Sequence, residues 1–90
     1  MGDKSPEQKL TTILNVLRNS KIDPAHKTFS NLAAGPLEDL LSDHGEEVID
    51  RIETEARKNP DFNLLLGGVW QGGMSEQIWE RVQRARLKVW

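Results

Sequence analysis

The chain has 90 residues with a net charge of −2, is 37% hydrophobic and 29% charged, and contains no cysteine. This length and composition indicate one ordinary globular domain over residues 1–90 and exclude both a second domain and a disordered chain. Disulfide bonds and zinc–thiolate sites are excluded, no segment approaches the roughly 20 apolar residues of a membrane span, and no apolar signal segment begins the chain, so we expect a cytoplasmic protein.

The first predicted helix begins after Ser5. Pro6 suits the first helical position, and Gln8 stands where a capping box places its reciprocal acceptor. Apolar residues at helical spacing then predict an amphipathic helix that ends near Asn19. These apolar residues are Leu10, Ile13, Leu14 and Leu17.

Two short helices are expected next, separated by a sharp break. Asp23-Pro24 resembles a second capped helix start. Gly35-Pro36 is expected to end that helix and begin another, because glycine terminates helices and proline is tolerated only in a first turn. Gly45 is expected to close this third helix as a left-handed cap residue after His44. Glu46 and Glu47 then open a fourth helix, since acids favour the positive end of the helix dipole.

The remaining chain predicts short helical segments around a glycine-rich connection. Asn59-Pro60 stops the fourth helix, and residues 61–66 add one or two helical turns. Residues 67–73 contain four glycines and predict a loop that acts as a hinge or a tight crossing. Ser75 caps the last helix, in which Trp79 is expected to face the core. No segment alternates as a strand does, so we predict an all-α fold, a compact bundle of about five short helices.

One part of the sequence resembles a family. The stretch Leu32–Leu41 contains Ala-Gly-Pro-Leu-Glu-Asp-Leu-Leu, and His44-Gly45 and Ile49-Asp50-Arg51-Ile52-Glu53 follow it. Together with Pro60, Phe62 and Val69-Trp70, this resembles an uncharacterised bacterial family known only as a domain of unknown function. The likeness covers about residues 30 to 86, and it implies a helical fold, a bacterial or phage origin and no particular activity. Helical pairs separated by tight breaks are also similar to HEAT-type repeats.

The best enzymatic candidate is a cluster of acids around His44, formed with Asp39, Asp43 and Glu47. Such a cluster can bind a divalent metal or supply acid–base groups. The expected break at Gly45 splits it, so we interpret the acids as a solvated face and His44 as a partner of helix-end carbonyls. The serines have no neighbouring base, and the glycine-rich loop lacks the Lys-Ser/Thr ending of a phosphate loop. We therefore predict no catalytic residue, metal or cofactor.

Acidic residues are concentrated in the middle of the chain, where residues 36–55 contain eight acids and one base. A surface of this kind favours a basic partner. We therefore expect a small non-enzymatic protein–protein interaction module, most concretely an inhibitor of the immunity, phage anti-defence or anti-CRISPR kind. The expected contact residues are Glu38, Asp39, Asp43, Glu46, Glu47, Asp50 and Trp70. Two alternatives stay open: Glu38 offsets its own helix dipole, and Trp70 fills the core instead of contacting a partner.

The last helix supplies an alternative function, because residues 81–88 contain four bases and no acid. Arg81, Arg84 and Lys88 share one face and predict phosphate contacts for a DNA-associated regulator. The interpretation we favour is that these bases complement the helix dipole and the neighbouring acids. The separated charges also permit a homo-oligomer, for which Trp90 is either an anchor or a frayed end. No membrane contact is expected.

Overall fold

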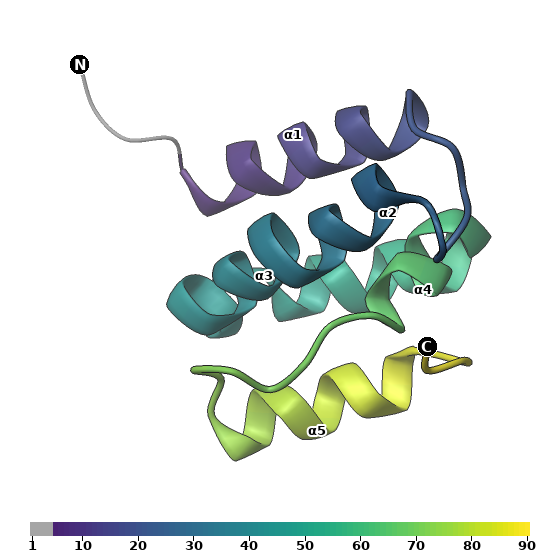
Figure 1. The fold of residues 1–90 in the computed structure, drawn as a ribbon. Coiled ribbons are helices and arrows are strands. Elements are labelled where there is room, and N and C mark those ends of the chain that lie inside the picture. The colour runs from purple at the N-terminus through teal and green to yellow at the C-terminus, as the bar shows by residue number, and fades with distance from the viewer. Residues whose placement is uncertain (1–4) are drawn as a thin grey trace.

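The computed structural model describes residues 5–90, and its regular elements are all helical (Figure 1). In chain order these elements are α1 (Pro6–Arg18), α2 (Lys27–Leu32), the π-helix η1 (Ala33–Leu37), α3 (Glu38–Lys58), α4 (Pro60–Leu66) and α5 (Glu76–Ala85). The radius of gyration is 11.9 Å, close to the roughly 12 Å of a compact domain of this size. The prediction of a compact all-α fold is confirmed. Within the described chain, no helix is both long enough and apolar enough to cross a membrane.

Helix α1 begins and ends as predicted. The Ser5 hydroxyl accepts from the Gln8 amide at 3.2 Å, and the Gln8 side chain accepts from the Ser5 amide at 3.0 Å, which completes the capping box. Asn19 follows the last helical residue.

The helix start predicted at Asp23-Pro24 is wrong. The Asp23 carboxylate accepts from the Ala25 amide and forms a turn, and α2 begins only at Lys27. Asp readily closes such a turn with its own side chain instead of capping a helix.

The predicted break at Gly35-Pro36 is also wrong. These two residues lie inside η1, and the Glu38 amide donates to the carbonyl of Ala33, five residues earlier. Pro36 lacks an amide hydrogen and would clash with the carbonyl four residues before it, and the wider π-turn accommodates both problems without ending the helix. Elements α2, η1 and α3 are therefore continuous, so residues 5–90 contain four helices instead of the expected five.

Gly45 does not act as the predicted left-handed cap. The backbone departs from helical geometry at His44 (φ −136°, ψ 28°), where α3 is kinked, and the helix then continues through Glu46 and Glu47. In the described part of the chain only Gly72 has a positive φ, of 51°. Gly45 is instead buried where α3 meets α5, next to Ile78. The kink re-aims the second half of α3, and the glycine provides a close contact.

The predicted signals for the last helices are confirmed. Asn59 follows α3 and also caps α4, because its side chain accepts from the amides of Asp61 and Phe62. Ser75 caps α5 by accepting from the Ile78 amide at 3.2 Å. Trp79 is only partly buried, and the guanidinium of Arg86 lies over its ring at 4.9 Å from the ring centre.

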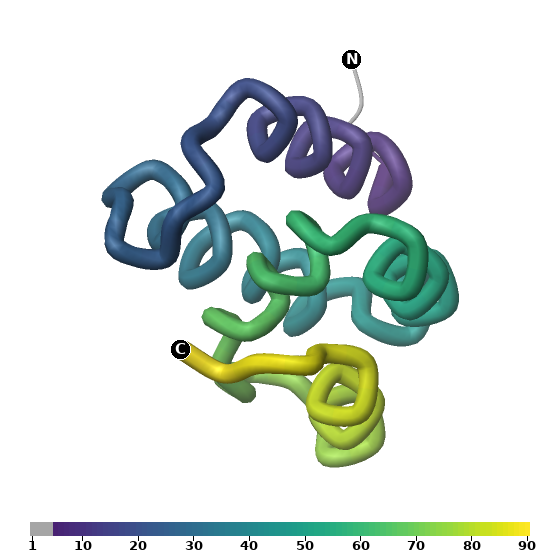
Figure 2. Tube along the Cα trace, turned by 90° about the vertical axis from the view of Figure 1, so that its right-hand side faces the viewer, coloured from purple at the N-terminus to yellow at the C-terminus, as the bar shows by residue number. Residues whose placement is uncertain are grey.

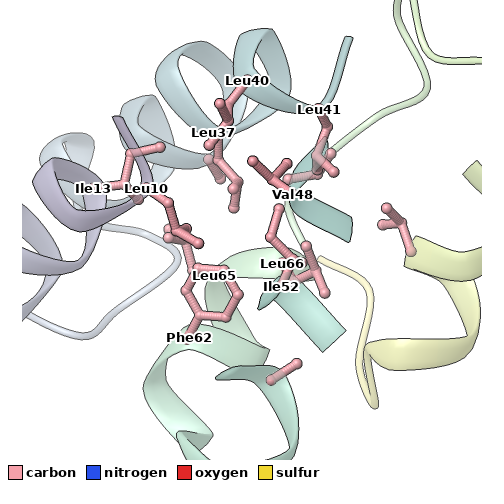
Figure 3. Close-up of a cluster of buried hydrophobic side chains, with 14 of the residues drawn as sticks. Leu10, Ile13, Leu37, Leu40, Leu41, Val48, Ile52, Phe62, Leu65 and Leu66 are labelled. Atoms are coloured by element: carbon pink, nitrogen blue, oxygen red, sulfur yellow. The ribbon is translucent and has the colours of Figure 1, made fainter. Parts of the chain in front are cut away.

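Helix α3 is the centre of the molecule. It contacts α1, η1, α4 and α5, and Figures 1 and 2 show it between α1 and α5. The central part of the core joins side chains from α1, η1, α3 and α4 (Figure 3). The residues labelled there are Leu10, Ile13, Leu37, Leu40, Leu41, Val48, Ile52, Phe62, Leu65 and Leu66, each at most 3% exposed. Because several helices pack on α3, its polar residues face different neighbouring helices.

The chain after α5 folds back onto the core. The Trp90 amide donates to the Gly67 carbonyl at 3.2 Å, its indole nitrogen donates to the Leu64 carbonyl, and its ring centre lies 5.5 Å from that of Phe29. A β-carbon at Gly68 would lie 2.3 Å from the Trp90 ring. The glycine pair therefore makes a tight crossing, as predicted. The alternative that Trp90 is a frayed end is therefore wrong, because the residue is partly buried against the core.

Candidate partner-binding surface

Glu38 connects the acidic helix to the loop that carries Trp70. Its Oε2 accepts from the Trp70 amide at 3.3 Å. The left-handed turn at Gly72 brings the loop so close that a β-carbon there would lie 3.0 Å from Glu38 Oε1. The first residue of α3 thus positions the loop. The dipole role raised from the sequence does not apply to Glu38, because the helix is continuous through η1 and Glu38 does not begin it.

The ring of Trp70 projects outward. The residue is 62% exposed, although its backbone is held by Glu38. The alternative that Trp70 fills the core is therefore wrong. The contact with Glu38 joins two features that the sequence presented as separate, the acidic helix and the tryptophan loop.

Asp39 and Asp43 lie one turn apart on a groove between α1 and α3. Both are exposed, and the groove has a volume of about 240 Å³. Its lining consists of Lys9, Thr12, Ile13, Pro36, Asp39, Leu40 and Asp43. Neither aspartate forms an ion pair within residues 5–90. These two acids therefore remain available to a basic group from outside the chain.

The acids farther along α3 face α5, where Arg81 binds two of them. Arg81 donates to both oxygens of Glu53, at 2.9 and 2.5 Å, and to Asp50 Oδ1 at 2.6 Å. The hydrogen bonds that Arg81 donates lower the pKa of Glu53, and the acceptance of these bonds by Glu53 and Asp50 raises the pKa of Arg81. Glu46 lines a hollow between the same two helices without forming an ion pair in the described chain. Asp50 is thus engaged within the molecule, whereas Glu46 is not.

The cluster proposed around His44 does not converge as metal ligands do. His44 Nδ1 lies 3.1 Å from Glu47 Oε1 across the kink, while Asp39 and Asp43 line the groove toward α1. No group of three or more histidine or acidic side chains with metal-binding geometry occurs in residues 5–90. His44 therefore pairs with a carboxylate, and not with the helix-end carbonyls expected from the sequence.

The prediction that Arg81, Arg84 and Lys88 share one helical face is wrong, because α5 ends at Ala85 and Lys88 lies beyond it. Arg81 is bound by α3, and Arg84 pairs with Glu80 on its own helix. Arg86 donates to the Val69 carbonyl at 2.9 Å, and its burial lowers its pKa. Lys88 is exposed in the tail. The favoured interpretation, that these bases complement neighbouring acids, is confirmed for Arg81.

Comparison with known proteins adds a family to this geometry. The model of a family described as "Family of unknown function (DUF6869)" matches residues 1–89. The chain belongs to this family. No curated protein and no solved structure matched the chain. The match confirms that the chain belongs to a family of unknown function, and it includes the first helix and most of the tail.

In this DUF6869 protein, two relationships were beyond sequence reasoning. The bond between Glu38 and the Trp70 amide joins residues 32 positions apart, and the ring contact between Trp90 and Phe29 joins the tail to α2. The sequence signals for these two contacts were indirect. One was the acid Glu38 at the start of α3, and the other was the glycine pair Gly67-Gly68 in the loop. Neither signal names its partner.

Proposed function

We propose that this protein is a non-enzymatic protein–protein interaction module that binds a basic surface of its partner. The observation that carries the proposal is that Trp70, 62% exposed, is held beside the start of the acidic helix by Glu38. Exposed tryptophans on positioned loops are typical centres of protein interfaces. The most concrete form of this proposal is an inhibitor of the immunity or phage anti-defence kind, which acts in a bacterial or phage-infected cytoplasm.

The charge distribution supports a basic protein partner over nucleic acid. Asp39, Asp43 and Glu46 form no ion pair within the described chain, so they attract a basic group and repel phosphate. Toward α5, in the hollow that Glu46 also lines, the guanidinium of Arg81 is already bound by Glu53 and Asp50. A DNA-binding role for α5 therefore has less support than the acidic surface.

The experiment is a pull-down from bacterial lysate with wild type beside two variants, Glu46→Lys/Glu47→Lys and Trp70→Ala. We expect each variant to lose a partner that wild type retains. Asp50 is left unchanged because its substitution would break the pair with Arg81. Circular dichroism checks that each variant is folded.

Matched controls test whether charge reversal or loss of an apolar side chain elsewhere on the protein also abolishes capture of the partner. Asp61→Lys/Glu76→Lys reverses two exposed acids in the first turns of α4 and α5, and Leu87→Ala truncates an apolar side chain that is 90% exposed. Both controls should retain the partner. The proposal is wrong if wild type and all four variants capture the same proteins, or if wild type binds duplex DNA with a steep salt dependence.

A further inference from the structure

The groove between α1 and α3 has an apolar floor and a charged margin. Ile13 from α1 and Leu40 from α3 are 3% and 2% exposed and form the floor, and Figure 3 labels both side chains. Pro36, kept within the continuous helix by η1, adds its exposed ring to the wall. At about 240 Å³, the groove exceeds the roughly 150 Å³ cavity that accommodates benzene. It therefore has room for a large apolar side chain from another molecule.

The charges of the groove specify the polarity of its occupant. Two of its lining residues are acidic and one, Lys9, is basic, which leaves an excess of one negative charge. Lys9 is partly buried along the wall formed by α1 and forms no ion pair with Asp39 or Asp43. The aspartates are spaced by one helical turn on α3, so a basic side chain lying along the groove can contact both.

We infer that this groove is the docking site for an amphipathic helix of a protein partner, which inserts one large apolar side chain and places Lys or Arg one turn away against Asp39 and Asp43. This inference rests on the proposed function and adds the chemistry of the partner and the place of contact. Helices that bind grooves present their anchor residues on one face, about one helical turn apart. Phosphate groups are excluded by the two acids, which separates this occupant from nucleic acid and from an anionic membrane.

The test uses a fluorescent helical peptide of about 15 residues with one leucine on its face and arginines one turn away on the same face. Its affinity is measured by anisotropy, and its site is mapped by amide chemical shifts. We expect shifts at residues of α1 and α3 that line the groove. A matched peptide with glutamate in place of arginine should bind about tenfold more weakly, as should one with alanine in place of leucine.

Two pairs of variants isolate the groove. Asp39→Asn/Asp43→Asn should weaken binding about fivefold, whereas Asp61→Asn/Glu76→Gln, which changes the same number of exposed acids outside the groove, should leave it near the wild-type value. Thr12→Phe fills the groove and should weaken binding about tenfold. Thr11→Phe is its control, since Thr11 is the exposed neighbour on α1 and does not line the groove.

Four results would overturn the inference: equal binding of the basic and acidic peptides, shifts that map away from the groove, wild-type affinity in Thr12→Phe, or a concentration-dependent dimer of the protein alone that Thr12→Phe disrupts. The last result would make a second copy of the chain the occupant. If the pull-down partner is lost by Trp70→Ala but retained by Asp39→Asn/Asp43→Asn and Thr12→Phe, the groove is wrong and the interaction function stands. If every variant captures the same proteins from the lysate as wild type does, the proposed interaction function itself is wrong.

Discussion

Gly45 of α3 packs directly against Ile78 of α5, and a β-carbon at Gly45 would lie 3.0 Å from Ile78 Cγ2 and 3.1 Å from Cγ1. Both separations are shorter than the roughly 3.5 to 4.0 Å at which carbon atoms attract each other best. The two helices approach this closely because no side chain stands between them. The glycine beside the kink therefore has a packing role, and it brings α5 near enough for Arg81 to reach the acids of α3.

Gly45→Ala should have little net effect on stability in the wild type. Replacing a helical glycine by alanine stabilises a helix by about 1 kcal/mol, and crowding against Ile78 offsets this gain. In the Ile78→Ala background the crowding is absent, so the same substitution should stabilise by about 1 kcal/mol. Urea unfolding of the four proteins in this cycle measures the coupling. Strictly additive effects would show that the two residues do not crowd each other.

Gly72→Ala should destabilise the fold by about 1.5 kcal/mol, because Gly72 has a φ of 51° and left-handed geometry is costly for residues with a β-carbon. The same β-carbon would also approach Glu38 Oε1. Gly72→Asn should cost less, since asparagine tolerates this conformation. Gly35→Ala is the control: nothing lies within 4 Å of the new methyl group, so denaturant unfolding should show no loss. An equal loss at both positions would contradict the explanation.

Trp90→Ala should destabilise the protein by about 2 kcal/mol, less than for a fully buried tryptophan because Trp90 is partly exposed. The substitution removes the ring contact with Phe29 and the hydrogen bond to the Leu64 carbonyl. Leu87→Ala, in the same tail but 90% exposed, should change stability by no more than about 0.5 kcal/mol. Thermal and denaturant unfolding compare the two. Equal effects would mean that the tail is not docked in solution.

The pair between Glu53 and Arg81 should make stability depend on pH. Arg81 lowers the pKa of Glu53 below its ordinary value of 4.5, so the folded state favours the carboxylate. Its contribution is therefore complete above that ordinary value and is lost as the pH falls through the lowered folded pKa. Glu53→Gln should destabilise the protein at neutral pH and lose this effect in acid.

Unfolding free energies of wild type and Glu53→Gln, measured across the acid range, check this sign. Glu80→Gln is the control, because it removes an exposed pair with Arg84 within one helix, and such pairs contribute at most about 0.5 kcal/mol. A difference between wild type and Glu53→Gln that stays constant down to the lowest pH would contradict the proposed linkage.

Local sequence signals determined which segments are helical and where several of them begin. The capping box of Ser5 and Gln8, the helix stop at Asn59-Pro60 and the cap at Ser75 were all predicted, because each depends on residues no more than four positions apart. Such contacts form within one helical turn, and the apolar stripe at helical spacing supports them whatever the rest of the chain does. The acids of the candidate surface were likewise visible as a run of charge.

Only the tertiary structure decided how those signals were used. Burial of Ala33 and Leu37, which flank Gly35-Pro36 in η1, keeps the chain helical there with one widened turn, although local rules predicted a break. It also assigns partners among similar acids: Glu38 to the Trp70 loop, Asp50 to Arg81, and neither Asp39 nor Asp43 to any base in the described chain. These choices depend on distances between residues far apart in sequence, which the order of amino acids does not display. The physical reason is that the burial of apolar surface stabilises the arrangement with the most complete core, even where that arrangement overrides a local preference.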